Sequence, residues 1–496
     1  MTAFSLEPAQ LARCAELRTV AAQRLHPLAD KGEPGHVNRA LVAELGSLGL
    51  LGRLFTSGAL DLCLMRESLA YACTEAETAL ALQGLGAHPV HAHGTEAQRA
   101  RWLPRVTTGT AIAAFALSEP GAGSDAAALQ LRAEAEVPGG GAPSLRAGAD
   151  ASRGGAAPGR PGGADALQDG GASSLRAGAD ASEGGAAPGL GAGADALQDG
   201  GAPGLRADAS RGGAVSGLGA GADASRGGRA QGRRVEADAP RGSGRVADVV
   251  GLGAEPDGSA RWRLSGEKCW ISNAPEADFY TVFARTTPDA GARGVTAFLV
   301  PADRQGLTGR GLDMLSPHPI GALDFDAVPV TADDVLGEVD RGFRVAMGTL
   351  NLFRPSVGAF AVGMAQAALD ATLAHTAGRD AFGGKLRDLQ AVSHQVAEMA
   401  LRTEAARLMV YAAASAYDAG APDVPRRSAM AKLLATETAQ YVVDTAVQLH
   451  GARALQRGHL LEHLYREVRA PRIYEGASEV QRGIIAKELY ARQEAR

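Results

Sequence analysis

The chain has 496 residues, enough for several domains, yet 65 of them are glycine and only 4% are aromatic. With 21% charged residues and a net charge of −5, it lacks the basic excess that binding to nucleic acid or to an anionic membrane surface requires. No apolar run reaches the roughly 18 residues of a membrane span, and the N-terminus lacks the pattern of a secretory signal. We therefore expect a cytoplasmic protein that binds neither nucleic acid nor membrane.

Helical periodicity covers the first part of the chain. Leu, Ala and Val recur at three- and four-residue spacings from Leu6 to about Val106, as in Leu41–Leu51. This spacing predicts an N-terminal helical domain over residues 1–110.

Apolar β-type segments follow. The segment Ala111–Leu117 ends in a glycine-rich turn, and Cys269–Ser272, Tyr280–Arg285 and Val295–Pro301 come much later in the chain. These pieces predict a middle β domain, resembling a barrel, formed by residues 111–131 and 259–335.

A stretch of different composition lies between these β segments. Residues 131–260 hold 33 of the 65 glycines and no aromatic residue, and Ser144–Asp150 recurs as Ser174–Asp180. A folded repeat must bury large apolar residues, and these repeats offer little beyond a Leu or two. Burial cannot offset a chain entropy of about 1–2 kcal/mol per residue, so we expect residues 132–258 to be a disordered low-complexity insertion. Its two flanks should lie at neighbouring strand ends.

Long helical blocks return from about Gly342 to Arg492. Examples are Ser356–Thr376, Asp388–Asp418 and Val424–His450, which Gly or Pro residues separate. They predict a C-terminal helical bundle over residues 336–496 and, for the whole chain, an α+β multidomain fold.

Histidine and cysteine do not indicate a metal site. The four cysteines are scattered without C-x-x-C spacing, which suits reduced thiols. The set H-x-x-H-x-H over residues 88–93, and His459 with His463, have no Cys or carboxylate arranged to complete a site. We expect no metal and predict that these histidines lie in loops or on the surface.

Turn formers, hydroxyls and carboxylates concentrate in two segments, Phe115–Asp125 (FALSEPGAGSD) and Ile473–Gln481 (IYEGASEVQ). The first could present N–H and hydroxyl donors to an oxygen-rich ligand, although a plain turn capped by Ser and Asp explains it as well. In the second, Glu475 is either a functional carboxylate or a residue favoured by the dipole of the helix that follows. Glu479, four residues later, is a second candidate for the same role.

These motifs together resemble those of the acyl-CoA dehydrogenases. The resemblance covers nearly everything outside the insertion and is also carried by Gly266–Asn273 (GEKCWISN), Gly378–Gln390 (GRDAFGGKLRDLQ) and Val447–Gly451 (VQLHG). It implies a helical N-terminal domain, a middle β domain and a C-terminal four-helix bundle that bind FAD between them. It also implies a homotetramer, built as a dimer of dimers, or a homodimer.

The resemblance implies the α,β-dehydrogenation of an acyl-CoA thioester to the trans-2-enoyl-CoA, with electrons passed to an electron-transfer flavoprotein. A thioester α-C–H is a weak acid, so a base must remove the α-proton while flavin N5 takes the β-hydride. By its place in the motif, Glu475 is the expected base. Some family members carry this Glu just before the position of Arg354, but Leu352 and Phe353 stand there.

The resemblance also implies ligand-binding residues. In the middle domain, Ser118 and Ser272 would donate hydroxyls to the isoalloxazine and Trp270 would pack against it, within the set Phe115, Leu117, Ser118, Trp270, Ile271 and Ser272. Contacts to a neighbouring subunit's FAD, where a guanidinium suits a pyrophosphate, would come from Arg379, Phe382, Gln390, Gln448 and Gly451. Further cofactor contacts would be Ala477, where Thr is usual, and Glu479. The substrate would meet Ser124, Arg354, Tyr474 and Gly476.

Other interpretations stay open. Trp270 could be a core residue, Arg354 a structural ion pair and Gln390 a surface residue. An oxidase or a flavin monooxygenase has the same fold, although the retained Glu475 argues against a monooxygenase. A non-catalytic relative, with the insertion as an interaction tether, is a third reading. No motif indicates the length or branching of the acyl chain.

Overall fold

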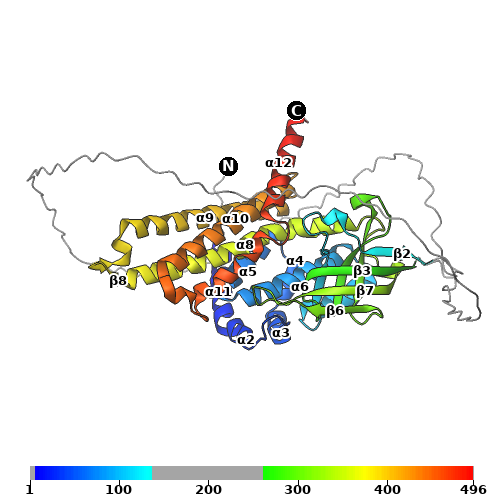
Figure 1. The fold of residues 1–496 in the computed structure, drawn as a ribbon, viewed down its shortest axis with the longest axis horizontal. Helices are drawn as coiled ribbons and strands as arrows, with labels where there is room; N and C mark the ends of the chain where they lie inside the picture. The colour runs from blue at the N-terminus through cyan, green and yellow to red at the C-terminus, as the bar shows by residue number, and fades with distance from the viewer. Residues whose placement is uncertain (1–5, 137–260, 495–496) are drawn as a thin grey trace, which may run out of the picture. The chain divides into compact units, whose positions relative to one another are not determined.

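The computed structural model describes residues 6–136 and 261–494, which belong to one compact unit (Figure 1). Helices, a mixed sheet and long helices follow one another along the chain, which confirms the predicted fold class. Most of the predicted insertion lies outside the described residues.

The N-terminal residues form a set of helices. The capping box of α7 illustrates their start signals, because Gln98 N donates to the Thr95 hydroxyl at 3.2 Å and Thr95 N donates to Gln98 Oε1 at 2.7 Å. The helices are α1 (Pro8–Val20), the π-helical turn η1 (Ala21–Leu25), α2 (His26–Ala29), α3 (Arg39–Ser47), α4 (Leu50–Thr56), α5 (Ala59–Ala72), α6 (Thr74–His93) and α7 (Glu96–Thr107).

The middle domain is a curled mixed sheet with strand order β1-β4-β2-β3-β7-β6, and β5 pairs with β4. The strands are β1 (Ala113–Ala116), β2 (Arg132–Ala135), β3 (Arg261–Ser272), β4 (Phe279–Arg285), β5 (Val295–Pro301), β6 (Leu307–Gly311) and β7 (Ile320–Thr331). Short 3-10 helices are η2 (Ala126–Ala128), η3 (Gly291–Gly294), η4 (Ala332–Asp334), η5 (Leu386–Asp388), η6 (Gly451–Leu455) and η7 (Ala470–Arg472).

Strand β2 corrects the predicted start of the insertion. Residues 132–135 were expected to belong to it but pair antiparallel with β3, with Ala135 opposite Trp262. Ala133 is buried while Arg132 and Glu134 are exposed, the alternation of a half-buried strand, and the small Ala side chains conceal this pattern in the sequence. The flanks of the undescribed stretch are therefore neighbouring strand ends, as predicted.

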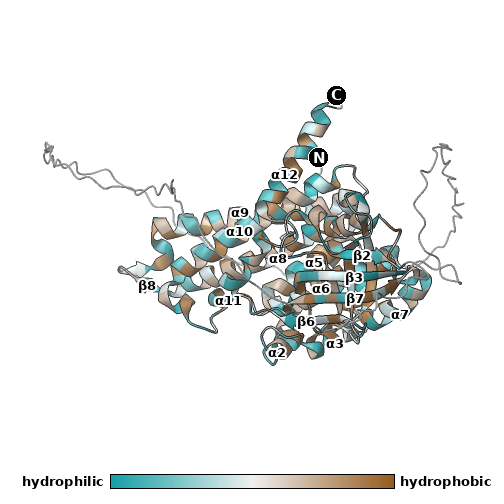
Figure 2. Cartoon of the chain, turned by 45° about the vertical axis from the view of Figure 1, so that its right-hand side comes forward, coloured by the Kyte–Doolittle hydropathy of each residue, from teal (hydrophilic) through white to brown (hydrophobic). Residues whose placement is uncertain are grey.

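The C-terminal residues form α8 (Gly342–Gly378), α9 (Gln390–Asp418), α10 (Val424–His450), α11 (Leu460–Glu467) and α12 (Ser478–Glu494), with a small hairpin of β8 (Asp380–Ala381) and β9 (Gly384–Lys385). Helix α8 packs against α5, α9 and α10, and α12 packs against α10 and then extends away from it (Figures 1 and 2). Within the described ranges, α8 alone is long and apolar enough to cross a membrane, but 72% of its most apolar window is buried, as expected of a core helix.

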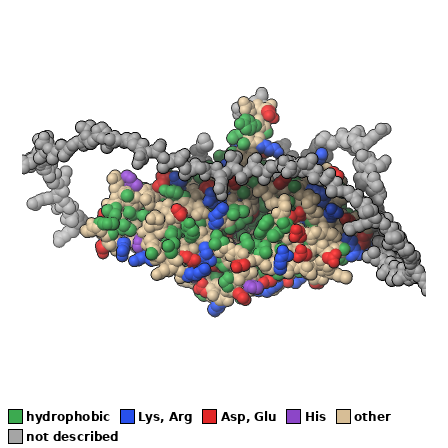
Figure 3. All heavy atoms as spheres, in the orientation of Figure 1, with side chains coloured by type: hydrophobic (Ala, Val, Ile, Leu, Met, Phe, Trp, Pro, Cys, Tyr) green, Lys and Arg blue, Asp and Glu red, His purple; other side chains and the backbone are tan. Residues whose placement is uncertain are grey.

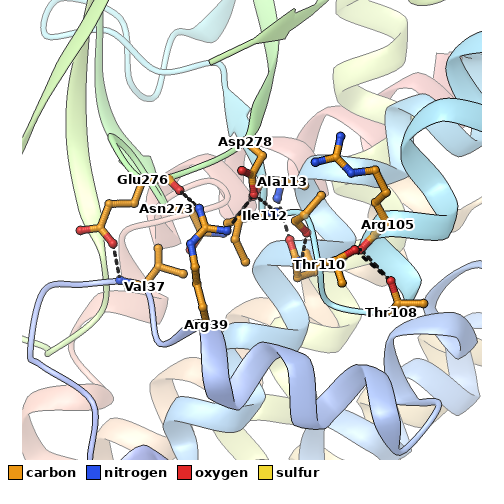
Figure 4. Close-up of polar contacts among 12 residues, drawn as sticks. Val37, Arg39, Arg105, Thr108, Thr110, Ile112, Ala113, Asn273, Glu276 and Asp278 are labelled. Atoms are coloured by element: carbon orange, nitrogen blue, oxygen red, sulfur yellow. Dashed lines mark hydrogen bonds and ion pairs between the residues drawn. The ribbon is translucent and has the colours of Figure 1, made fainter. Parts of the chain in front are cut away.

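A polar seam joins the start of α3 to the sheet (Figure 4). Arg39 pairs with Asp278 at 2.9 Å and also donates to the Glu276 carbonyl, while Val37 N donates to the Glu276 carboxylate at 3.0 Å. Asp278 in turn accepts from Ile112 N at 2.7 Å, just before β1. The seam therefore fixes the start of β1 and the glycine-rich motif that follows this strand.

Candidate active site

Glu475 lies in a strained turn between η7 and α12. Glu475 and Gly476 have φ angles of 52° and 95°, in the left-handed region that side chains disfavour. A Cβ at Gly476 would collide with the side-chain amide of Gln481. Backbone strain of this kind persists only where the surroundings hold it, and it concentrates at functional sites.

Three buried side chains hold this turn by its carbonyl groups. Lys432 Nζ donates to the Gly476 carbonyl at 2.8 Å, and Arg354 Nε donates to the Glu475 carbonyl at 3.2 Å. Gln481 Nε2 donates to both, at 3.2 Å to Glu475 and 2.9 Å to Gly476. Arg354, Lys432 and Gln481 are at most 5% exposed and come from α8, α10 and α12. We call these three residues the carbonyl clamp.

The clamp leaves the carboxyl group of Glu475 free. Its Oε2 atom is buried and has no hydrogen-bond partner among the described residues. Burial raises the pKa of Glu475, while the charges of Arg66, Lys432 and Arg354 oppose that rise. A carboxylate with a buried, unpartnered oxygen and a raised pKa is a strong proton acceptor, and such groups cluster at catalytic sites.

Two charged residues that the motifs did not indicate lie near this turn. Arg66 and Glu77 form a buried ion pair, and Arg66 Nη1 also donates to the Ser356 hydroxyl at 2.6 Å. Burial raises the pKa of Glu77. Because both residues occur in helices of mixed character, no sequence pattern separates this pair from ordinary surface charges.

Trp270 stands on a bulge in β3. The pairing of β3 with β7 shifts register between Lys268 and Ile271, and Trp270 has a φ of 56°. Its side chain is 49% exposed, whereas that of Ile271 is buried in the core. Bulges re-aim side chains next to functional sites, so Trp270 is a surface aromatic and not a core residue.

Two hydroxyls accompany the Trp270 bulge. Cys269 N donates to the Ser118 carbonyl at 3.0 Å, which brings the end of the β1 motif beside β3. The hydroxyls of Ser118 and Ser272 have no hydrogen-bond partner within the described part of the chain. An exposed aromatic side chain and hydroxyl donors on adjoining backbone segments suit a planar cofactor with polar edge atoms, as expected of a flavin.

A buried ion pair next to the bulge connects β3 to the segment that follows β1. Lys268 Nζ donates to the Glu119 carboxylate at 2.8 Å and to the Leu117 carbonyl at 2.9 Å. Glu119 also accepts from Leu131 N at 2.9 Å. The pair therefore joins the two motif segments on which Ser118 and Trp270 lie.

A further group of predicted residues lies at the end of the helical bundle near β8. Phe382 is 90% exposed with a φ of 53°, and the rings of His375 and His450 stack with centroids 4.1 Å apart. Histidine side chains are visible at this end of the unit in Figure 3. The predicted cofactor residues here are all exposed or at loops: Arg379, Phe382, Gln390, Gln448 and Gly451. In Figure 1, β8 and the label of β3 lie at opposite ends of the unit.

The remaining predicted residues differ in burial. Ser124 is exposed in the turn after β1, and Tyr474 is 37% exposed. The carboxylate of Glu479 is 80% exposed and pairs with Arg482 at 3.2 Å, so it does not share the environment of Glu475. Ala477 is half-buried before α12.

The histidine prediction is wrong in part. His88, His91 and His93 belong to helix α6, and burial lowers the pKa of His88 to about 4. The His88 ring lies on the side of α6 that packs against Phe353. The spacing of the histidines in the sequence did not indicate that this side of the helix faces the core. Within residues 6–136 and 261–494, no group of three or more His, Cys, Asp or Glu residues could hold a metal ion.

Comparison with known proteins matches three parts of the chain to one family. The matched models are the acyl-CoA dehydrogenase N-terminal domain (residues 7–110), middle domain (242–328) and C-terminal domain (340–490). A Mycobacterium tuberculosis protein named "Probable acyl-CoA dehydrogenase" is 39% identical over 252 residues, which are 50% of this chain and 64% of that protein. The mitochondrial short-chain specific acyl-CoA dehydrogenase of Bos taurus is 39% identical over 251 residues, 50% of this chain and 60% of that protein.

A solved structure agrees over a longer range. The butyryl-CoA dehydrogenase of Megasphaera elsdenii superposes with a TM-score of 0.69 at 25% identity, covering 98% of this chain and 99% of that one. The aligned part of this chain spans just under two thirds of the length of the curated relatives.

Proposed function

The chain belongs to the acyl-CoA dehydrogenase family, and from that premise we propose that it oxidises an acyl-CoA thioester to the trans-2-enoyl-CoA. The observation that carries the proposal is the Oε2 atom of Glu475, which is buried without a hydrogen-bond partner among the described residues, in a turn that three side chains hold. Such a group suits the removal of an α-proton, the step that this oxidation requires of the protein.

FAD is the proposed cofactor. When bound, it supplies the electron sink for the β-hydride. Trp270 would pack against its ring, and the unused hydroxyls of Ser118 and Ser272 would donate to its polar edge, with Phe115, Leu117 and Ile271 behind them. The predicted residues at the bundle end near β8, above all Arg379, would bind the FAD of a second copy. We therefore propose a homodimer or a dimer of dimers.

In the proposed reaction, the task of the protein's own side chains is to remove one proton from the substrate. Glu475 Oε2 accepts the α-proton of the substrate, and the charges of Arg66, Lys432 and Arg354 keep the carboxylate ionised before that transfer. Arg354 and Gln481 hydrogen-bond to the backbone carbonyl of Glu475. These bonds fix the position of the residue without occupying its carboxylate. Ser124, Tyr474 and Gly476 would line the path of the thioester.

Electrons are proposed to leave for an electron-transfer flavoprotein, the acceptor that the family resemblance implies. An oxidase reading predicts instead that O₂ is consumed in step with product, so oxygen uptake during turnover separates the two. A non-catalytic reading predicts that the purified protein carries no flavin.

The decisive experiment compares the wild type with Glu475→Gln on a panel of acyl-CoA thioesters, with reduction of an artificial acceptor and identification of each product. The variant should keep its flavin and lose at least about 10²-fold in turnover, the minimum expected of a positioned base. Retention of more than about a tenth of the activity would remove Glu475 from this role.

A further inference from the structure

Lys432 is a buried lysine that no motif singles out. It lies on α10 with a fully buried side chain, and within residues 6–136 and 261–494 its ammonium donates one hydrogen bond, to the Gly476 carbonyl at 2.8 Å. We propose that Lys432 is a positioning residue for the base: its ammonium fixes the turn that carries Glu475 and keeps the Glu475 carboxylate ionised. This inference rests on the proposed role of Glu475.

The first part of the argument concerns geometry. Glu475 precedes Gly476, and both residues have positive φ angles that relax unless their peptide groups are held. Arg354 holds only the Glu475 carbonyl, and Gln481 reaches both carbonyls from α12 itself, the helix that follows the turn. Lys432 is thus the clamp residue that ties the Gly476 carbonyl to a different element of the bundle. Its loss leaves that carbonyl to Gln481.

The second part concerns charge. Transfer of an ammonium into the interior is unfavourable, and an apolar side chain of similar length would fill the same space without that cost. A lysine at this position is therefore explained better by its charge than by packing. The burial lowers the pKa of Lys432 to about 8, while the charge of Glu475 acts to raise it. The ammonium accordingly stays protonated at neutral pH.

The charged groups that act on Lys432 come from the turn before α12, from α12 itself, from α10 and from α8. Glu475 and Glu479 lie in and after the turn, Glu437 lies one helical turn further along α10, and Arg354 lies on α8. Glu437 is already paired with Arg472 at 2.9 Å and accepts from the Ser478 hydroxyl, and Glu479 is paired with Arg482. Of these carboxylates, Glu475 is the one with a buried oxygen, Oε2, that has no hydrogen-bond partner among the described residues. The charge of Lys432 therefore acts chiefly on Glu475.

Three substitutions separate the two roles. Lys432→Arg keeps the charge and the donor, Lys432→Gln keeps a donor without charge, and Lys432→Met removes both with little change in length. Lys487→Met is the matched control, because Lys487 is exposed on α12 and takes no part in the clamp. If Lys432→Met fails to fold, Lys432→Gln gives the same reading of the charge.

The first measurement needs no turnover. Infrared difference spectra between each variant and the same variant carrying Glu475→Gln, recorded across pH 4–9, follow the protonation of the Glu475 carboxyl directly. We expect Lys432→Met and Lys432→Gln to raise the midpoint by about one pH unit, as the loss of a neighbouring opposite charge does. Lys432→Arg and Lys487→Met should leave it in place. A midpoint that moves by less than about 0.3 unit in both uncharged variants would overturn the charge role.

The second measurement is the pH profile of kcat/KM with the best thioester of the panel. Because protonated Glu475 is inactive, the acidic limb should move to higher pH in the uncharged variants and stay in place in Lys432→Arg. A lysine that only fixed the turn would lower kcat equally at every pH, and this result would overturn the charge role. If the wild type oxidises no thioester while the infrared midpoint still moves, the proposed function fails and the charge coupling stands.

Discussion

Arg354 contacts the backbone of Glu475 and not its carboxylate. Arg354 Nε donates to the Glu475 carbonyl at 3.2 Å, and no ion pair joins the two side chains within the described ranges. The charge of Arg354 acts on the Glu475 carboxyl from a greater distance, opposing the rise in its pKa. A guanidinium that bonded the carboxylate directly would consume the lone pairs that a base needs. By holding the peptide group instead, Arg354 fixes the position of the carboxylate and leaves it free to accept a proton.

This contact predicts that the shape of the guanidinium at residue 354 matters for turnover even when its positive charge is kept. Arg354→Lys keeps a positive charge near Glu475 but loses the planar guanidinium, so we expect kcat to fall about 10- to 100-fold through misplacement of the base. The acidic limb of the pH profile should stay near its wild-type position. A limb that moves upward as far as in the uncharged Lys432 variants would show that Arg354 acts mainly through its charge.

Glu475 should cost the protein stability at neutral pH. Its pKa in the folded state is raised above the unfolded value, so its carboxyl favours folding below the unfolded pKa, and that benefit is lost as pH rises through the folded pKa. Glu475→Gln should therefore raise the melting temperature at pH 7–8, by roughly 1–3 °C for a protein of this size. The difference should shrink towards pH 4, near the unfolded pKa of about 4.3. Scanning calorimetry at both pH values tests this, and an equally large gain at pH 4 would contradict it.

The buried pair of Lys268 and Glu119 should behave differently from a surface ion pair. Lys268→Met leaves the Glu119 carboxylate buried without its counter-charge, which typically costs about 3–5 kcal/mol. Lys268→Met combined with Glu119→Gln should recover much of that loss, because no uncompensated charge remains. Urea unfolding of the single and double variants measures both values. Equal losses in the two would show that the hydrogen bonds, and not the charge, stabilise this region.

Arg379 links cofactor binding to assembly in the proposed function. Arg379→Ala should lower the flavin content of the purified protein and weaken its association together, because the same guanidinium would bind the pyrophosphate of a second copy's FAD. Arg387→Ala is a matched control, since Arg387 is exposed in the nearby η5 and its ion pair in the described part of the chain is with the neighbouring Asp388. Gel filtration and flavin absorbance measure the two effects. An unchanged oligomer with full flavin content would remove Arg379 from the cofactor site.

The fold class could be predicted from periodicity and from several motifs in order, and the candidate base from the family resemblance that these motifs carry; the residues around Glu475 alone did not separate it from Glu479. Lys432 and Gln481 were not predicted as parts of the site, because each lies within a helix where a lysine or a glutamine is common. Their importance comes from a carbonyl group 44 or 5 residues away in the chain. Strand β2 was missed because its inward residue, Ala133, is too small to mark a strand.

The pairing of β2 with β3 gives the sharpest test of the undescribed stretch. Ala135 lies opposite Trp262, and Glu136 N donates to the Arg261 carbonyl at 3.0 Å, so residues 136 and 261 already face each other as the last pair of a hairpin. Arg263 also pairs with Glu136 at 2.5 Å. A two-residue turn fits between such a pair, and Asn-Gly is the strongest sequence for it.

We therefore expect residues 137–260 to be replaceable by Asn-Gly without loss of flavin or kcat. Closing a loop of about 124 residues costs roughly 3–4 kcal/mol more than closing one of two residues, on the logarithmic scaling of loop entropy. The stretch has no aromatic residue and few large aliphatic residues with which to recover that cost, so the shortened protein should melt at an equal or higher temperature. A ten-residue Gly/Ser linker at the same position is the control, because it removes the stretch without demanding a tight turn. Loss of flavin or of soluble protein in both versions would mean that residues 137–260 contribute contacts on which the folded enzyme depends.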